Sequence, residues 1–204
     1  DVKKLREMTN VGMMDCKKAL QATDGDMDKA VDWLREKGLA KAAKKADRVA
    51  AEGVAYAAVI GGVGVVIEVN SETDFAAKTD AFLDLVKNLA VIVAEQNPAD
   101  IEALKACTYP GTNLTVTEVM QEKVMSIGEN MQIRRFARFP ENTSVAYVHA
   151  GGTHGVLVNL AVEGDIDVTE IGKNVAMQIA AMNPKYWDKS LVPQADVDHE
   201  LQVQ

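Results

Sequence analysis

The sequence predicts an α+β fold: an N-terminal three-helix module, followed by two related α+β subdomains with antiparallel hairpins backed by helices. Three observations lead to this prediction. Apolar residues in the first 38 positions follow helical spacing. The order strand, Gly-Gly, strand, helix, Asn-Pro occurs twice, with Gly61 and Gly151 about 90 residues apart. A chain of 204 residues is long enough for a core domain and a small additional module.

The N-terminal module is predicted to span residues 1–38. Leu5 and Met8 mark one face of the first helix, and Met27, Val31 and Leu34 mark one face of the third. Gly38 is expected to end the third helix as a C-cap. Three short helices bury little apolar area, so the module suits recognition better than catalysis.

A basic linking helix is expected over residues 39–53. Its cationic side chains lie at positions i, i+3, i+4 and i+7, and therefore on one helical face: Lys41, Lys44, Lys45 and Arg48. Such a face is either simply solvated or meets an acidic partner.

The first core subdomain is predicted over residues 54–140. Gly61-Gly62 suits a two-residue hairpin turn, because glycine accepts positive φ. Thr115 and Glu118 form a capping pattern before another helix. The predicted elements are strands 54–60 and 63–70, helices 79–96 and 116–127, and strand 131–139, with Ile133, Arg135 and Ala137 on one face.

The second core subdomain is predicted over residues 141–204. Its strands are expected at 144–150 and 154–162, joined by a turn at Gly151-Gly152, and its helix at 169–182. The strand order is not predictable from this pattern.

Charge and composition exclude several function classes. Residues 1–52 carry 12 Lys and Arg against 10 Asp and Glu, whereas the remainder carries 10 against 20. An acidic body repels phosphate backbones, so direct nucleic-acid binding is disfavoured. No apolar run reaches the roughly 18 residues of a membrane helix. We therefore expect a cytoplasmic protein, or an organellar-matrix protein if a transit peptide was removed, with Cys16 and Cys107 as free thiols.

The familiar catalytic motifs are missing from the sequence. It contains no GxxxxGK[ST], GxSxG or HExxH motif and no paired CxxC. His149 and His154 flank a Gly-Gly turn, but two imidazoles do not make a metal site. We expect no cofactor, no metal and no covalent catalysis.

Three segments resemble the elongation factor Ts family. Residues 9–20 read TNVGMMDCKKAL, residues 68–75 read EVNSETDF, and residues 127–135 read IGENMQIRR. Their order and spacing also fit the family, over nearly the whole chain. This sequence has Ala76 where many members have Val. The sequence stops at Gln204, where many members continue into a C-terminal extension, so we expect either a short form of the family or a truncated chain.

The resemblance implies a guanine-nucleotide exchange factor for elongation factor Tu, which binds the GDP complex and disrupts its Mg²⁺ and phosphate site so that GTP can rebind. By analogy Thr73, Asp74 and Phe75 dislocate the Mg²⁺, with Phe75 entering an apolar crevice of the GTPase domain. Contacts with that domain and a second Tu domain are also implied. Further candidate contacts are Met13 and Met14, placed in a loop between helices, with Lys17, Lys45, Ile127 and His149.

Each candidate also has a structural alternative. Thr73 or Asp74 could cap a helix while Phe75 packs into the core. Core packing or a solvated position would likewise account for the other candidates, and His149 could be a hydrogen-bonded surface imidazole. At the level of function, the alternatives are a ubiquitin-associated-like binding module without exchange activity and an enzyme with an unrecognised site. An edge strand or exposed helix could also support a homodimer.

Overall fold

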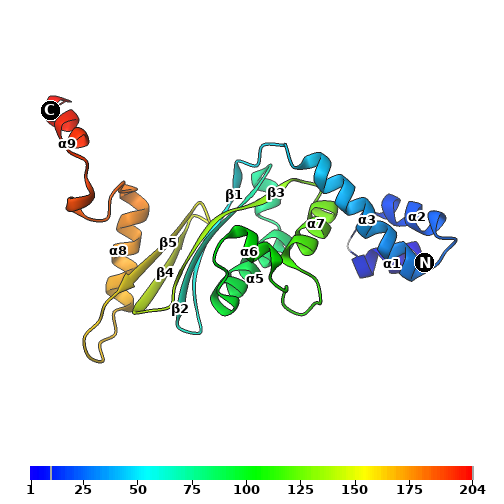
Figure 1. Ribbon diagram of the computed structural model, residues 1–204, viewed down its shortest axis with the longest axis horizontal. Coiled ribbons are helices and arrows are strands. Elements are labelled where there is room, and N and C mark those ends of the chain that lie inside the picture. The colour runs from blue at the N-terminus through cyan, green and yellow to red at the C-terminus, as the bar shows by residue number, and fades with distance from the viewer. Residues whose placement is uncertain (10, 204) are drawn as a thin grey trace.

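The computed structural model describes residues 1–9 and 11–203; Asn10, which belongs to the first resembling segment, and Gln204, the last residue, lie outside this description. The molecule is elongated, with the N-terminal helices at one end and α9 at the other (Figure 1). Its elements in chain order are α1 (Val2–Thr9), α2 (Met13–Ala22), α3 (Met27–Lys45), β1 (Glu52–Ile60), β2 (Val63–Ser71), α4 (Asp74–Ala77), α5 (Asp80–Gln96), α6 (Ile101–Ala106), α7 (Val116–Ile127), β3 (Met131–Phe139), β4 (Thr143–His149), β5 (His154–Leu160), α8 (Thr169–Met182), η1 (Lys189–Leu191) and α9 (Gln194–Val203).

The N-terminal module is present as three helices with a small hydrophobic core of their own. That core consists of Leu5, Val11, Cys16, Ala19, Leu20, Ala30 and Leu34. The predicted helix end at Gly38 is wrong, since α3 continues to Lys45. A Cβ at Gly38 would lie 3.3 Å from the sulfur of Met125, so this glycine lets α3 approach α7 closely and does not cap a helix. The separate linking helix expected after Gly38 is therefore the second half of α3.

The central sheet has the order β1-β2-β3, with both neighbouring pairs antiparallel. Gly61 and Gly62 have φ values of 57° and 84° and form the predicted two-residue turn between β1 and β2. Alternate residues of these strands face α5, whose own buried side chains include Phe82 and Leu85. The main core lies between this sheet face and helices α5, α6 and α7.

The long helices after residue 53 begin or end at residues that cap them. Thr79 accepts a hydrogen bond from the main-chain N–H of Phe82 and starts α5, and Thr115 with Glu118 forms the predicted capping box of α7. Both α5 and α8 end at an asparagine in the left-handed conformation, Asn97 and Asn183, each followed by proline.

A β-bulge makes the predicted face of β3 wrong. Glu68 pairs with Arg135, whereas the next residue, Val69, pairs with Ile133, so Arg134 is the extra residue. The insertion reverses the alternation: Ile133 is buried before the bulge, and Phe136 packs on the core after it. Ile133 and Arg135 therefore do not share one face.

The second hairpin, β4-β5, lies on the face of the central sheet opposite to α5. A Cβ at Gly64 would lie within 2.8 Å of atoms of Ser144 and Leu157, and a Cβ at Gly155 would lie equally close to the main chain of Ala55. The β4-β5 connection is a four-residue loop, 150–153, because His149 pairs with His154; the predicted two-residue turn is wrong. Helix α8 covers the other side of the hairpin through Gly172 and Ala176 (Figure 1). We propose the loop between β3 and β4 as the subdomain boundary.

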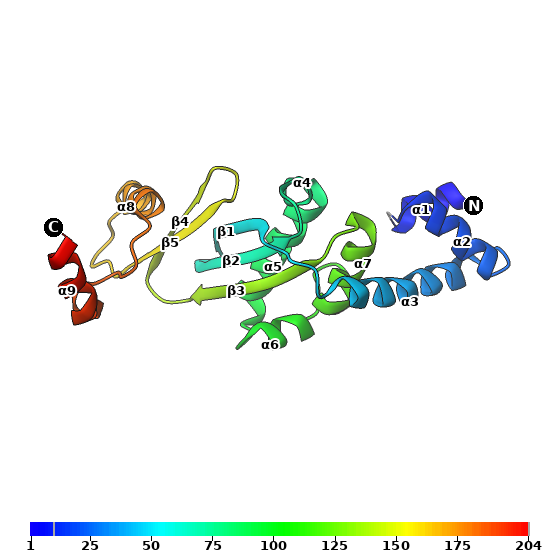
Figure 2. The same ribbon diagram turned by 90° about the horizontal axis from the view of Figure 1, so that it is seen from above.

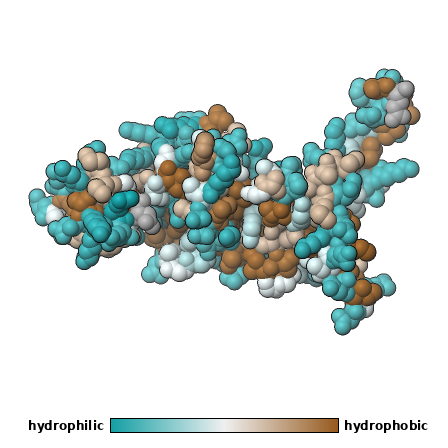
Figure 3. Space-filling view, turned by 180° about the vertical axis from the view of Figure 1, so that it is seen from behind, coloured by the Kyte–Doolittle hydropathy of each residue, from teal (hydrophilic) through white to brown (hydrophobic). Residues whose placement is uncertain are grey.

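Three elements were not predicted, α6, η1 and α9, and the single turn α4 was foreseen only in the alternative that Thr73 or Asp74 caps a helix. Helix α9 has no buried residue and stands apart from the body, and hydrophobic surface is visible on it (Figure 3). None of the described helices has the length and apolar character needed to cross a membrane.

Candidate functional site

The turn that carries Phe75 presents a large aromatic side chain at the surface. Thr73 is the N-cap of α4, and its hydroxyl accepts a hydrogen bond from the main-chain N–H of Ala76 at 3.3 Å. Ala76 and Ala77 are buried, and Ala77 belongs to the main core. Phe75 points the other way and is 80% exposed. The alternative in which Phe75 packs into the core is therefore wrong, although Thr73 does cap the helix.

Asp74 lies beside Phe75 and is paired within the same turn. Its carboxylate accepts a hydrogen bond from the Lys78 ammonium at 2.6 Å, and both side chains are largely exposed. This hydrogen bond and the charge of Lys78 hold the pKa of Asp74 below its ordinary value. The turn thus presents an ionised carboxylate and an aromatic ring next to one another.

The loop that joins α7 to β3 lies directly against this turn. The Glu129 carboxylate accepts hydrogen bonds from the main-chain N–H of Thr73 at 3.0 Å and from its hydroxyl at 2.7 Å. In return, the main-chain N–H of Asn130 donates to Glu72 at 2.6 Å. We call these four residues, Glu72, Thr73, Glu129 and Asn130, the clasp.

The basic end of α3 reaches the same loop. The Lys45 ammonium donates to the carbonyl of Gly128, and the Asn130 side-chain amide donates to the carbonyl of Arg48 at 2.8 Å. Arg48 also pairs with Glu72 at 3.5 Å. Lys41 pairs with Asp15 of α2 at 2.7 Å. Of the four cationic side chains on the predicted basic strip, three therefore contact other parts of this chain.

The ionised form of Glu72 is expected to stabilise the fold. The N–H of Asn130 first, and the positive charge of Arg48 second, lower the pKa of Glu72 from its ordinary 4.5. A lowered folded-state pKa gives stability that is present above pH 4.5 and is lost as the pH falls through the folded-state pKa. The stability difference between wild type and Glu72→Gln in urea unfolding should therefore be larger at about pH 6 than at about pH 3. A difference that does not change with pH would contradict this prediction.

The structure brings some of the predicted site residues together and separates others. Thr73, Asp74 and Phe75 lie at the clasp, with Lys45 beside it and Ile127 two residues from Glu129. Ile127 is half-buried and packs against the core. The clasp partners Glu72, Glu129 and Asn130 were not predicted, because Glu129 is 56 residues from Thr73 and no local pattern links them.

The other predicted residues lie on different elements. Met13 and Met14 are the first residues of α2, not a loop, and they are 53% and 65% exposed; Lys17 follows on the same helix and is also exposed. His149 ends β4, is exposed, and has its Nδ1 2.8 Å from the Tyr147 hydroxyl. The tip of the β4-β5 hairpin and α4 both extend beyond the β1 edge of the central sheet (Figure 2).

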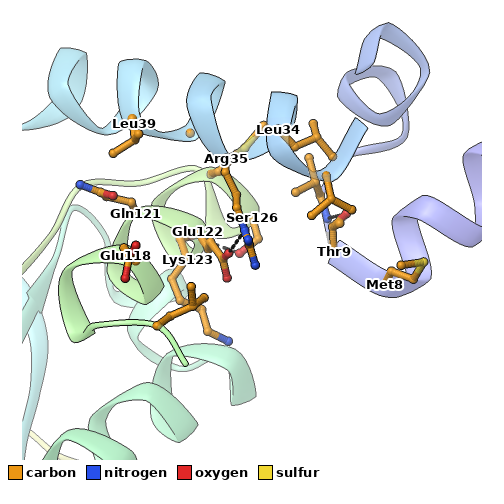
Figure 4. Close-up of a pocket in the computed structure, with 15 residues that line it drawn as sticks. Met8, Thr9, Leu34, Arg35, Leu39, Glu118, Gln121, Glu122, Lys123 and Ser126 are labelled. Atoms are coloured by element: carbon orange, nitrogen blue, oxygen red, sulfur yellow. Dashed lines mark hydrogen bonds and ion pairs between the residues drawn. The ribbon is translucent and has the colours of Figure 1, made fainter. Parts of the chain in front are cut away.

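A second candidate is a cavity of about 440 Å³ between the N-terminal module and α7. Arg35 of α3 and Glu122 of α7 form an ion pair of 3.1 Å across it (Figure 4). Glu118, also in its wall, is occupied by the cap of α7. Within residues 1–9 and 11–203, no group of three or more His, Cys, Asp or Glu is placed to hold a metal ion. The cavity lies at the seam between the small N-terminal core and the main core.

The family model described as Elongation factor TS matches residues 72–204 of this chain. The matched region begins at the clasp and includes α4, the α7–β3 loop and the whole second hairpin.

Proposed function

The chain belongs to the elongation factor Ts family, and we propose that it binds the GTPase elongation factor Tu and promotes the release of GDP. The family gives it a role in protein synthesis as an exchange factor. We propose that this chain contacts two domains of Tu, the GTPase domain and a second domain. The clasp and its exposed Phe75 are the features of this chain that support the proposal.

Release of GDP from the GTPase is slow because the contacts to its phosphates and to Mg²⁺ must all break at the same time. A GTPase of this kind holds the phosphates and Mg²⁺ with main-chain amides, a lysine and metal ligands. An exchange factor accelerates release by binding the distorted pocket more tightly than the intact one. By thermodynamic linkage, it then weakens nucleotide binding by the same factor by which nucleotide weakens its own binding. A barrier lowered by about 4 kcal/mol corresponds to roughly a thousandfold faster release.

The exposed ring of Phe75 is the observation that carries the proposal. A large aromatic side chain on an anchored turn loses contact with water only when a partner covers it. Burial of a Phe side chain supplies roughly 1.5–3 kcal/mol toward distortion of the partner. We propose that Phe75 enters an apolar crevice of the GTPase domain, and that Asp74, already ionised, reorganises the polar groups around the metal.

The remaining candidates are proposed as additional contacts. Met13, Met14 and Lys17 on α2 provide adaptable apolar surface and a cation at the N-terminal end. Lys45 and Ile127 border the clasp, and His149 lies at the tip of the second hairpin. These contacts would orient this protein on Tu so that Phe75 lies at the apolar crevice of the GTPase domain.

The test measures release of a fluorescent GDP analogue from Tu with and without the full chain. We expect strong acceleration that saturates with increasing concentration of this protein. Direct binding to nucleotide-free Tu should be measured on the same samples. Binding without acceleration would contradict exchange activity and favour a simple binding protein, and the absence of both would contradict the choice of partner.

A further inference from the structure

The turn that carries Phe75 is hydrogen-bonded to a residue from a distant part of the chain. Helix α4 has only four residues, and a single turn is not stable by itself because nucleation costs more than one hydrogen bond returns. Its N-cap, Thr73, is held by the Glu129 carboxylate through two hydrogen bonds of 3.0 and 2.7 Å. Without them, Thr73 keeps the hydrogen bond from the Ser71 hydroxyl to its carbonyl at 2.9 Å, and α4 keeps its buried Ala76 and Ala77, but the N-cap side chain loses the partner that fixes it.

Glu129 is itself well placed to act as a fixed support. The flanking Gly128 has a φ of 90° and ends α7, and its carbonyl accepts from Lys45. On the other side, Asn130 is buried and makes hydrogen bonds to Glu72 and to the carbonyl of Arg48. The carboxylate of Glu129 therefore projects from a loop that is hydrogen-bonded to α3, to Arg48 just after α3, and to Glu72 just before α4.

We infer that Glu129 is a positioning residue for exchange: it acts through Thr73 to hold Phe75 in the orientation that enters the partner. This inference rests on the proposed function. A group that is already ordered loses less conformational entropy when it binds, so its contacts are available for distortion of the partner. When the turn is disordered in the free protein, part of the binding free energy is used to order it.

The kinetic consequence is specific. Surfaces on α2 and on the second hairpin do not depend on Glu129, so docking on Tu should persist when Glu129 is changed. The maximal rate of GDP release at saturation should fall, while the half-saturating concentration changes little. A general loss of structure would instead weaken binding and stability together.

The chain offers a closely matched control in Glu118. Its carboxylate accepts from the main-chain N–H of Thr115 at 2.7 Å and from the Thr115 hydroxyl at 2.8 Å, which are the same two groups that Glu129 engages on Thr73. Glu118→Ala therefore removes the same chemistry from the start of α7. It should lower thermal stability about as much as Glu129→Ala, without a change in the rate of exchange.

The experiment compares wild type, Glu129→Ala, Glu129→Gln and Glu118→Ala in the GDP-release assay. We expect Glu129→Ala to lower the maximal rate at least about tenfold, with less than about a threefold change in half-saturation. Glu129→Gln keeps one acceptor oxygen and should fall between wild type and Glu129→Ala. An unchanged maximal rate for Glu129→Ala, or an equal loss in Glu118→Ala, would overturn the inference.

Hydrogen exchange of the free proteins separates this inference from the proposed function. In Glu129→Ala the amides of Thr73 and Ala76 should exchange at least about tenfold faster than in wild type, whereas Glu118→Ala should affect only the start of α7. Unchanged amide exchange at Thr73 and Ala76 would show that Glu129 does not order the turn. If wild type itself fails to accelerate GDP release, the proposed function is wrong, and the amide measurement alone still decides whether Glu129 holds the turn.

Discussion

Phe75→Ala is expected to abolish the acceleration of GDP release and to leave the free energy of unfolding nearly unchanged. The ring is 80% exposed, so its removal leaves no cavity in the fold. The Thr73 cap and the buried Ala76 and Ala77 anchor α4 without it. The loss should appear as a lower maximal release rate on Tu, measured beside thermal unfolding of the same preparations.

Phe82 provides the matched control for this substitution. It lies seven residues further along the chain and is completely buried in the main core. Phe82→Ala should therefore destabilise the protein by about 3–5 kcal/mol. A folded sample of this variant at low temperature should still accelerate exchange, because Phe75 is intact. A large drop in melting temperature for Phe75→Ala, or full activity of that variant, would contradict the role assigned to Phe75.

Gly155→Ala is expected to destabilise the contact between the second hairpin and the central sheet. A Cβ at this position would lie 2.8 Å from the carbonyl carbon of Ala55, 2.9 Å from its oxygen and 3.0 Å from the nitrogen of Tyr56. These are main-chain atoms of a paired strand, so they cannot move aside as a flexible side chain can. Overpacking of this kind costs about 1–3 kcal/mol, which urea unfolding should detect.

The adjacent residue offers a control for Gly155→Ala. His154 lies on the same strand and is exposed, so His154→Ala should change stability by less than about 0.5 kcal/mol. Hydrogen exchange should also show faster exchange at Ala55 in Gly155→Ala, because its amide donates to the Gly152 carbonyl at 2.7 Å across this contact. Equal stability of Gly155→Ala and wild type would show that the hairpin can shift to make room.

The local signals in the sequence located most of the regular elements. Gly61-Gly62, the Thr115 and Glu118 pair, and the two Asn-Pro sequences act within a few residues, and the structure has a turn, a capping box and two helix ends at these positions. The periodicity of the long α5 is equally local, since its buried face repeats along one helix. The first hairpin and helices α5, α7 and α8 could therefore be predicted closely.

The errors in the predicted fold occur where distant contacts outweigh local preference. Gly38 looks like a helix end, but α3 continues to Lys45, and the missing side chain of Gly38 makes room for Met125 of α7. Arg134 is an extra residue in the pairing of β3 with β2, so the alternating residues of β3 before it and after it do not share one face as expected. No pattern within β3 reveals this bulge. The single-turn α4 has too little periodicity to be recognised.

For the candidate site, the sequence by itself determined the residues Thr73, Asp74 and Phe75 and their likeness to a family motif. Only the tertiary structure decided that Phe75 faces solvent, because burial depends on whether another element covers the ring, and none of the described residues does so enough to bury it. It also decided that Glu129 supports Thr73 and that Lys45 contacts the same loop. These hydrogen bonds join groups 56 and 83 residues apart, and such pairs meet only after the sheet and its helices have assembled.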